Sequence, residues 1–281
     1  MEPREPLTTS LVQRASQTLV CGALGAVSLF ITHVLNTTTV RHAERVAAAF
    51  DSRAPSQGII TVSNHVTSVD DPGAVAPLVP ASWLLNPSRL RWTLCAADRC
   101  FTNPIVGGLL TAGRALPIER GRGPLQPGMD AVVRLLNNGD WVHMFPEGAR
   151  QPFGPGLARM RPGVGRLVAD AVPTPVVLPF YHRGIHNLMV GPLPLGAGHR
   201  VDIVVGKPVT GLPELIGSMR SAGSAERDIH VAIADRIGAA LADLRAELEV
   251  ELGPEATARG AIAAASAKRE SGRSDTPRGT S

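Results

Sequence analysis

Residues 60–72, ITVSNHVTSVDDP, pass from a β-rich run through small polar residues to a proline. Pro72 suits the first position of a helix, and Asp71 before it suits the capping position. His65 and Asp70 therefore bracket a strand-to-helix turn, which is where open α/β sheets bind ligands. Their spacing in such a turn allows the Asp70 carboxylate to accept the Nδ1 hydrogen of His65. The other ring nitrogen is then an outward-facing base.

The H-x-x-x-x-D spacing alone is weak support, because His230 and Asp235 also show it. That second pair falls in an amphipathic helix expected over 229–248, where residues advance by ~100° and the two side chains end about 140° apart around the axis. They cannot meet, so His230 is a decoy. For His65 and Asp70 two interpretations stay open: a catalytic base with its orienting carboxylate, or a hydrogen-bonded turn histidine with a capping aspartate.

Working outward from this turn, β-rich runs alternate with helical patterns. The candidate strands are 58–63, 92–96, 141–145, 175–180 and 201–205. Residues 126–137 and 229–248 carry apolar side chains at helical spacing. The alternation predicts an α/β fold, with one domain over 38–252 that packs helices around a mixed β-sheet. Residues 253–281, rich in Gly, Ala, Ser and Arg, are expected to form a disordered tail.

The N-terminal segment, residues 1–37, contains an uncharged run at 18–35, TLVCGALGAVSLFITHVL. The run falls just short of the ~20 apolar residues that a spanning helix needs. We expect a membrane-interacting helix that lies in or dips into one leaflet, with Arg14, Arg41 and Arg45 at the headgroup level. A helix buried against the core is the alternative, and a cleaved signal peptide is the weaker one.

Composition excludes several classes of protein and site. The net charge of +4 is spread along the chain and only six Phe, three Trp and one Tyr are present, so no nucleic-acid partner is expected. Cys21, Cys95 and Cys100 lack C-x-x-C spacing, which argues against a disulfide framework or a cysteine zinc site and fits a reducing compartment. His182 and His186 have no nearby carboxylate pair, so no metal site is expected.

Two further stretches carry candidate binding residues. In GRALPIERG, residues 113–121, an apolar run ends at a glutamate and an arginine; in WVHMFPEGAR, residues 141–150, a strand pattern ends in a turn. Solvated, ion-paired loops and ordinary turns use the same residues. However, arginine forks that hold an anion and a carboxylate that accepts a hydroxyl suit a substrate with a phosphate and a hydroxyl group. The candidate substrate-binding residues here are Arg120, Glu147, Gly148 and Arg150.

Four blocks resemble, in order and spacing, those of the glycerolipid acyltransferase family. They are NHVTSVD (64–70), the G-x-x-x-P-I-E-R run (113–120), FPEG (145–148) and PVVLP (175–179). Stretches at 91–102 and 128–148 are also similar to one subfamily, the phospholipid–lysophospholipid transacylases. The resemblance implies an acyltransferase domain that moves acyl chains among cardiolipin and related phospholipids and lysophospholipids, without acyl-CoA or any metal or redox cofactor, at mitochondrial membranes.

Carried over by residue, the resemblance implies that His65 is the general base and Asp70 its orienting carboxylate. It also implies that Asn64, which flanks the base, is a candidate substrate-binding residue. Arg120 would bind phosphate, and Glu147 with Gly148 would bind substrate. The PIERG run is closer to acyl-CoA-dependent enzymes, so a 1-acylglycerol-3-phosphate acyltransferase is one alternative. A non-catalytic lipid-binding protein at a membrane surface is another, and the cytoplasmic face of a bacterial inner membrane is the alternative location.

Overall fold

The computed structural model describes residues 11–151, 157–191 and 193–253 of the chain. A seven-stranded sheet has the order β1-β7-β6-β2-β5-β3-β4. All neighbouring pairs are parallel except β6 and β7, which are antiparallel, so the predicted α/β fold with a mixed sheet is confirmed. The strands are β1 (Thr37–Arg41), β2 (Ile59–Val62), β3 (Trp92–Ala96), β4 (Ala115–Ile118), β5 (Trp141–Met144), β6 (Val176–Arg183) and β7 (Arg200–Val205).

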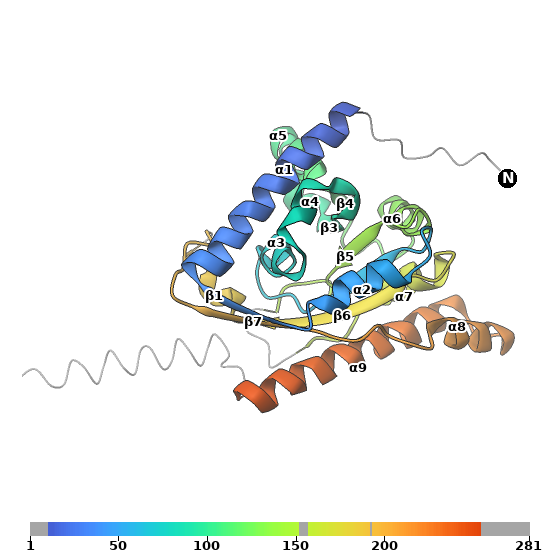
Figure 1. Ribbon diagram of the computed structural model, residues 1–281. Coiled ribbons are helices and arrows are strands. Elements are labelled where there is room, and N and C mark those ends of the chain that lie inside the picture. The colour runs from blue at the N-terminus through green and yellow to red at the C-terminus, as the bar shows by residue number, and fades with distance from the viewer. Residues whose placement is uncertain (1–10, 152–156, 192, 254–281) are drawn as a thin grey trace, which may run out of the picture.

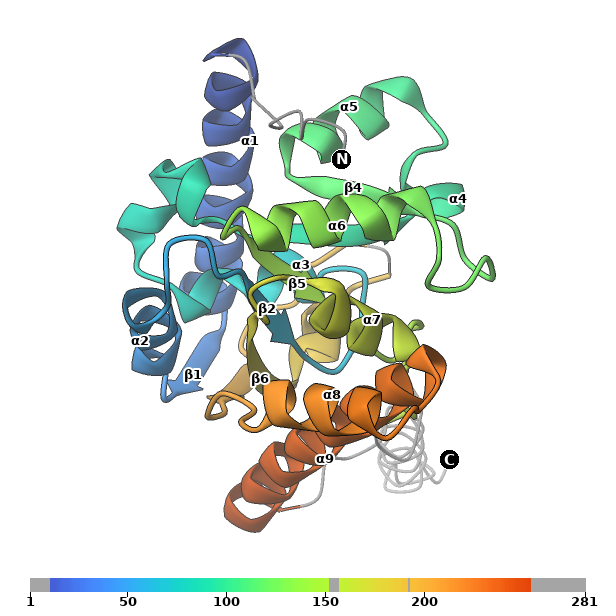
Figure 2. The ribbon, with the colours of Figure 1, turned by 90° about the vertical axis from the view of Figure 1, so that its right-hand side faces the viewer.

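Helices cover both faces of this sheet (Figures 1 and 2). The α-helices are α1 (Leu11–Leu29), α2 (Glu44–Ser52), α3 (Asp70–Gly73), α4 (Ala97–Cys100), α5 (Pro104–Ala112), α6 (Pro127–Asn137), α7 (Pro162–Asp170), α8 (Leu212–Ser221) and α9 (Glu226–Leu252). A π-helical segment, η1 (Phe30–Leu35), continues α1, and four short 3₁₀ segments are η2 (Ala76–Leu78), η3 (Ala81–Leu85), η4 (Pro87–Arg89) and η5 (Ile185–Leu188).

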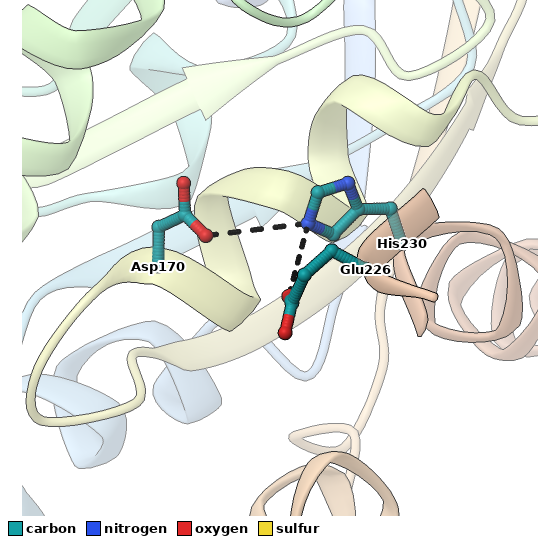
Figure 3. Close-up of side chains that lie close together, drawn as sticks. All are labelled: Asp170, Glu226 and His230. Atoms are coloured by element: carbon teal, nitrogen blue, oxygen red, sulfur yellow. Dashed lines mark ion pairs between the residues drawn. The ribbon is translucent and has the colours of Figure 1, made fainter. Parts of the chain in front are cut away.

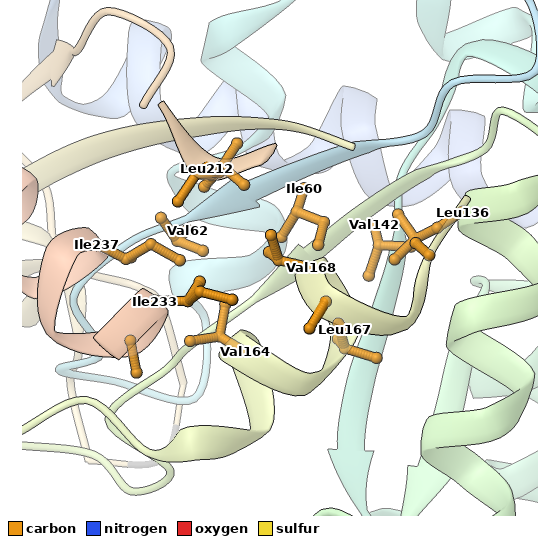
Figure 4. Close-up of a cluster of buried hydrophobic side chains, with 14 of the residues drawn as sticks. Ile60, Val62, Leu136, Val142, Val164, Leu167, Val168, Leu212, Ile233 and Ile237 are labelled. Atoms are coloured by element: carbon orange, nitrogen blue, oxygen red, sulfur yellow. The ribbon is translucent and has the colours of Figure 1, made fainter. Parts of the chain in front are cut away.

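Side-chain alternation along the central strands builds a core on each face. Ile60 and Val62 of β2 join a cluster with α6, α7, α8 and α9, part of which Figure 4 shows. Ile59 of the same strand and Trp141 of β5 join a second cluster beneath α1 and α2. Because successive strand residues point to opposite faces, one short apolar strand supplies both layers. The apolar stripe predicted over 229–248 faces the first cluster from α9.

The N-terminal helix has its polar side toward the protein. Gln17, Cys21, Ser28 and Thr32 are buried, whereas the apolar side chains on the other side of α1 and η1 are exposed: Val12, Leu19, Val27, Phe30 and Val34. A helix that packs on a water-soluble core shows the opposite arrangement. The alternative that this helix is buried against the core therefore holds only for its polar side.

Some expectations for the N-terminal half are wrong. Arg41 pairs with Asp202 and Glu251, and Arg45 donates to the Val205 carbonyl at 2.7 Å, so the protein itself binds both guanidinium groups. Asp71 does not cap a helix, because its buried carboxylate accepts from Arg91.

Two of the three cysteines are paired with each other. Cys95 and Cys100 form a disulfide, contrary to expectation, and Cys21 is free and buried. The bond joins neighbouring elements β3 and α4, so it is a local link and not a framework. The domain limits at residues 37 and 252 stay predictions, and the tail at 254–281 lies outside the described residues.

Candidate active site

His65 and Asp70 meet in the turn between β2 and α3. The Nδ1 atom of His65 lies 2.9 Å from Oδ2 of Asp70. The same carboxylate closes the turn, because it accepts the backbone N–H groups of Val66 at 2.6 Å and Thr67 at 2.9 Å, and the Thr67 hydroxyl at 2.6 Å. The two interpretations of this motif are thus compatible: one carboxylate both orders the turn and orients the imidazole.

The pair combines a buried charge with an accessible base. The Asp70 side chain is fully buried, while 20% of the His65 side chain is exposed. Burial opposes ionisation of Asp70, but the nearby His182, the hydrogen bond from His65 and the Thr67 hydroxyl outweigh it and hold the pKa of Asp70 below its usual value. His65 also stacks on Phe145, with ring centroids 3.9 Å apart. The imidazole is therefore fixed with Nδ1 toward an anion.

Asn64 anchors the turn to β6, and its predicted role in substrate binding stays a prediction. Its Nδ2 donates to the His182 carbonyl at 2.9 Å, and its Oδ1 accepts the His182 backbone N–H at 3.0 Å. The His182 Nε2 donates to the Asn64 carbonyl at 3.0 Å and lies 3.9 Å from Oδ2 of Asp70. Both residues are buried. His182 belongs to the support of Asp70, which its chain spacing to His186 did not indicate.

Glu147 is also buried, with 2% exposure, and both its oxygens accept backbone N–H groups. Oε1 accepts from His65 at 2.9 Å, and Oε2 accepts from Ala158 at 2.8 Å. Burial raises the pKa of Glu147, and these two N–H donors oppose the rise. On the other side of the base, the Gln151 N–H donates to the His65 carbonyl at 2.7 Å. This geometry fits a residue that positions the base, and the substrate-binding role that the sequence predicts stays a prediction.

Two candidates beside Glu147 lie at the surface. Gly148 is exposed and has a φ of +72°, so it supplies a backbone conformation that other residues rarely adopt. Arg150 is exposed as well. Within the described part of the chain, neither residue forms a hydrogen bond or ion pair with the His65 turn, and their roles toward substrate stay predictions.

Arg120 follows β4 at the same edge of the sheet. Strands β2, β5, β3 and β4 are mutually parallel, so the turns after them share one edge. Neighbouring strands lie ~4.8 Å apart, which puts the turns after β2 and β4 about 14 Å apart. The Arg120 fork binds the Asp98 carboxylate, not Glu119, which pairs with Arg122 at 2.7 Å. A surface hollow of ≈ 680 Å³ is lined by Ala97, Asp98, Glu119, Arg120 and Gly121.

The fold and the His-Asp turn define an acyltransferase. Residues 37–183, more than half of the chain, match the acyltransferase family, and the chain belongs to that family. A solved structure, the 1-acyl-sn-glycerophosphate (LPA) acyltransferase PlsC from Thermotoga maritima, has the same fold. Its TM-score is 0.50 at 15% identity, over 79% of this chain and 83% of that one.

Within the family, the chain is similar to tafazzins. The chain is 32% identical to Tafazzin of Drosophila melanogaster over 82% of its own length and 61% of the relative. It is 34% identical to Taffazin of Dictyostelium discoideum over 61% of its length and 62% of the relative, so it spans about three fifths of these proteins. It is also 30% identical to N-acylphosphatidylethanolamine synthase of Arabidopsis thaliana, over 79% of the chain and 89% of that relative.

Proposed function

We propose that this acyltransferase is a phospholipid–lysophospholipid transacylase that remodels the acyl chains of cardiolipin and other phospholipids without acyl-CoA. The contact between His65 and Asp70 at the carboxyl edge of the sheet carries the proposal. The similarity to tafazzins favours a phospholipid over acyl-CoA as the acyl donor. The acyl-CoA-dependent alternative shares the fold with the Thermotoga maritima enzyme and the acidic run before Arg120.

In the proposed reaction, His65 Nε2 removes the proton from a lysophospholipid hydroxyl while that oxygen attacks the ester carbonyl of the donor. The tetrahedral intermediate collapses, the donor ester C–O bond breaks, and His65 returns the proton to the departing alkoxide. Asp70 stabilises the imidazolium formed between these steps. General-base help of this kind contributes about 10²–10⁴-fold to the rate.

Direct attack fits the hydroxyl groups of the turn. Ser63 is buried and its Oγ donates to the Asn64 carbonyl, and the Thr67 hydroxyl donates to Asp70. Neither hydroxyl is available to His65 as a nucleophile. This arrangement is consistent with direct attack by the acceptor hydroxyl on the donor carbonyl, without an acyl-enzyme intermediate on Ser63 or Thr67.

Arg120 is the proposed phosphate-binding residue. Its side chain and that of Asp98 are 48% and 56% exposed. Solvent screens an exposed ion pair strongly, so a lipid phosphate can replace the Asp98 carboxylate. The bidentate fork suits two phosphate oxygens.

We also infer that the apolar side of α1 contacts a bilayer. The helix from Val12 to Leu35 is long and apolar enough to cross a membrane, judged by length and composition. It contacts α5, where Cys21 Sγ lies 3.6 Å from the Ala112 carbonyl, and α5 also exposes apolar side chains at Ile105, Val106 and Leu109. A mitochondrial membrane stays the prediction of the resemblance.

The test is acyl transfer from a labelled phospholipid to a lysophospholipid, with and without added acyl-CoA. Transfer that needs no acyl-CoA and disappears in His65→Ala, while the exposed His199→Ala control keeps it, supports the proposal. Transfer that occurs only with acyl-CoA favours the alternative enzyme. Lipid binding without transfer in the parent protein contradicts both enzymatic proposals.

A second candidate follows from the Arabidopsis thaliana relative, whose name states synthesis of N-acylphosphatidylethanolamine and which matches over 89% of its length. In that reaction the acceptor is a headgroup amine instead of a hydroxyl, and the same base can remove its proton. Offering phosphatidylethanolamine and a lysophospholipid in the same assay separates the candidates, because an amide product resists mild alkaline hydrolysis and an ester does not.

A further inference from the structure

We propose that Asp170, Glu226 and His230 form a binding site for a divalent transition-metal ion, of the zinc class, between α7 and α9. Asp170 is the last residue of α7, and the other two lie in the first turns of α9. One ligand atom from each lies within 4.8 Å of the others. Figure 3 shows the imidazole of His230 directed toward both carboxylates. This cluster is separate from the His65 site.

His230 supplies the second observation. Its side chain is only 9% exposed, and its buried Nε2 has no hydrogen-bond partner. Nε2 lies 4.0 Å from Oδ1 of Asp170 and 3.8 Å from Oε2 of Glu226. Both distances are longer than a hydrogen bond, and leaving a buried polar atom without a partner is unfavourable. An ion between the three atoms would give Nε2 the partner it lacks.

The charges around the cluster are compatible with a bound cation. Arg166 Nε binds Oδ2 of Asp170 at 2.9 Å, while Oδ1 faces His230. Arg220 binds both oxygens of Glu226, at 2.8 and 3.0 Å, but the Glu226 side chain is 53% exposed and can turn. Asp130 also pairs with Arg166. The cluster thus contains three carboxylates, from Asp130, Asp170 and Glu226, and two guanidinium groups, from Arg166 and Arg220. Their net charge is one negative charge, beside a neutral imidazole.

The ligand types select the ion. One imidazole nitrogen with two carboxylate oxygens suits Zn²⁺ or Co²⁺, whereas Ca²⁺ and Mg²⁺ prefer oxygen ligands alone. Zinc ligands lie about 2.0–2.2 Å from the metal, so binding requires the carboxylates to approach Nε2. The exposed Glu226 is the ligand that moves most easily, and water completes the tetrahedron.

The position of the site indicates a structural role. A Cβ added at Gly165 of α7 would lie 1.9 Å from the His230 carbonyl oxygen, so the two helices approach each other closely here. The opposite end of α7 begins beside Arg161, whose N–H donates to the Pro146 carbonyl of the Glu147 turn. A helix of nine residues is about 13 Å long. The ion would therefore join α7 to α9 at the end away from the base and stabilise the fold.

The experiment titrates Zn²⁺ into the untagged, chelator-treated full chain by calorimetry, and follows Co²⁺ by visible absorption. One equivalent of Zn²⁺ should bind and raise the Tm, and His230→Gln should weaken binding at least tenfold and abolish the rise. Asp170→Asn should weaken binding too, while His199→Gln, which removes an exposed histidine, should bind like the parent. No binding by the parent, or equal binding by His230→Gln, would overturn the proposal. Circular dichroism of the metal-free proteins checks that each variant is folded.

Discussion

Replacing Glu147 with glutamine separates a positioning role from a substrate-binding role. The carboxylate accepts the N–H groups of His65 and Ala158, one on each oxygen. Glutamine keeps one acceptor oxygen but turns an NH₂ donor toward the other N–H. One charge-assisted hydrogen bond is lost, a change of about 1.5–3 kcal/mol.

The expected loss of rate follows from that energy. Each ~1.4 kcal/mol corresponds to a tenfold change in rate, so a displaced His65 lowers kcat by about 10–100-fold. The Michaelis constant for the lysophospholipid should stay nearly unchanged, because the Glu147 carboxylate is buried and accepts from the backbone of His65 and Ala158. A domain of this size loses about 2–4 °C of Tm per kcal/mol, so a loss of about 1.5–3 kcal/mol should lower the Tm by roughly 3–12 °C.

The assay measures initial rates of acyl transfer in mixed micelles over a range of acceptor concentrations, together with thermal unfolding. Glu214→Gln is the matched control, because Glu214 is exposed in the first turn of α8 and the substitution removes the same charge. A raised Michaelis constant with unchanged kcat and Tm in Glu147→Gln would refute the positioning role and restore the substrate-binding role that the sequence predicts.

Three further perturbations test other parts of the structure. Arg120→Lys should raise the Michaelis constant for the phospholipid acceptor because the fork is lost, while Asp98→Asn should lower it because a competing carboxylate is removed; shifts in the same direction would exclude the pair from phosphate binding. Burial lowers the pKa of His143 to about 4, so the unfolded state binds more protons below about pH 6.5 and the protein should lose about 2 kcal/mol of stability between pH 7 and 5. His143→Leu should remove that loss, as measured by urea unfolding at both values, and an unaltered pH dependence would contradict the assignment. Ile105→Glu should reduce sedimentation with liposomes, while Val250→Glu, at an equally exposed position on α9, should not; equal binding by both variants would place the membrane contact elsewhere.

The strands missed from the sequence are the two edges of the sheet. β1 consists mostly of threonine, and its side chains are only partly buried, so it shows no apolar alternation. β4 is four residues long and contains Pro117, which fits an edge because proline cannot donate to a ladder. The central strands carry apolar residues on both faces, and their sequence pattern therefore indicates them clearly.

The base and its carboxylate could be located from the sequence because they lie in one turn. Their support could not, because it comes from distant segments: Glu147 and Gln151 after β5, and His182 in β6. The partner of Arg120 could not be located from the sequence either. Glu119 is its chain neighbour, but the parallel pairing of β3 with β4 brings Asp98 beside it instead.

The two parts of the site differ in how firmly they are held, and this difference bears on specificity. His65 is fixed at its ring by Asp70 and at both backbone atoms by the turn after β5. Arg120 stands at the end of an edge strand and is held by an exposed ion pair with Asp98. Preorganisation of the base is needed for any acyl acceptor, whereas headgroups differ in the charge and position of their phosphate. We therefore expect substitutions near Asp98 to alter headgroup preference with little effect on kcat, and substitutions around Glu147 to lower kcat for every acceptor alike.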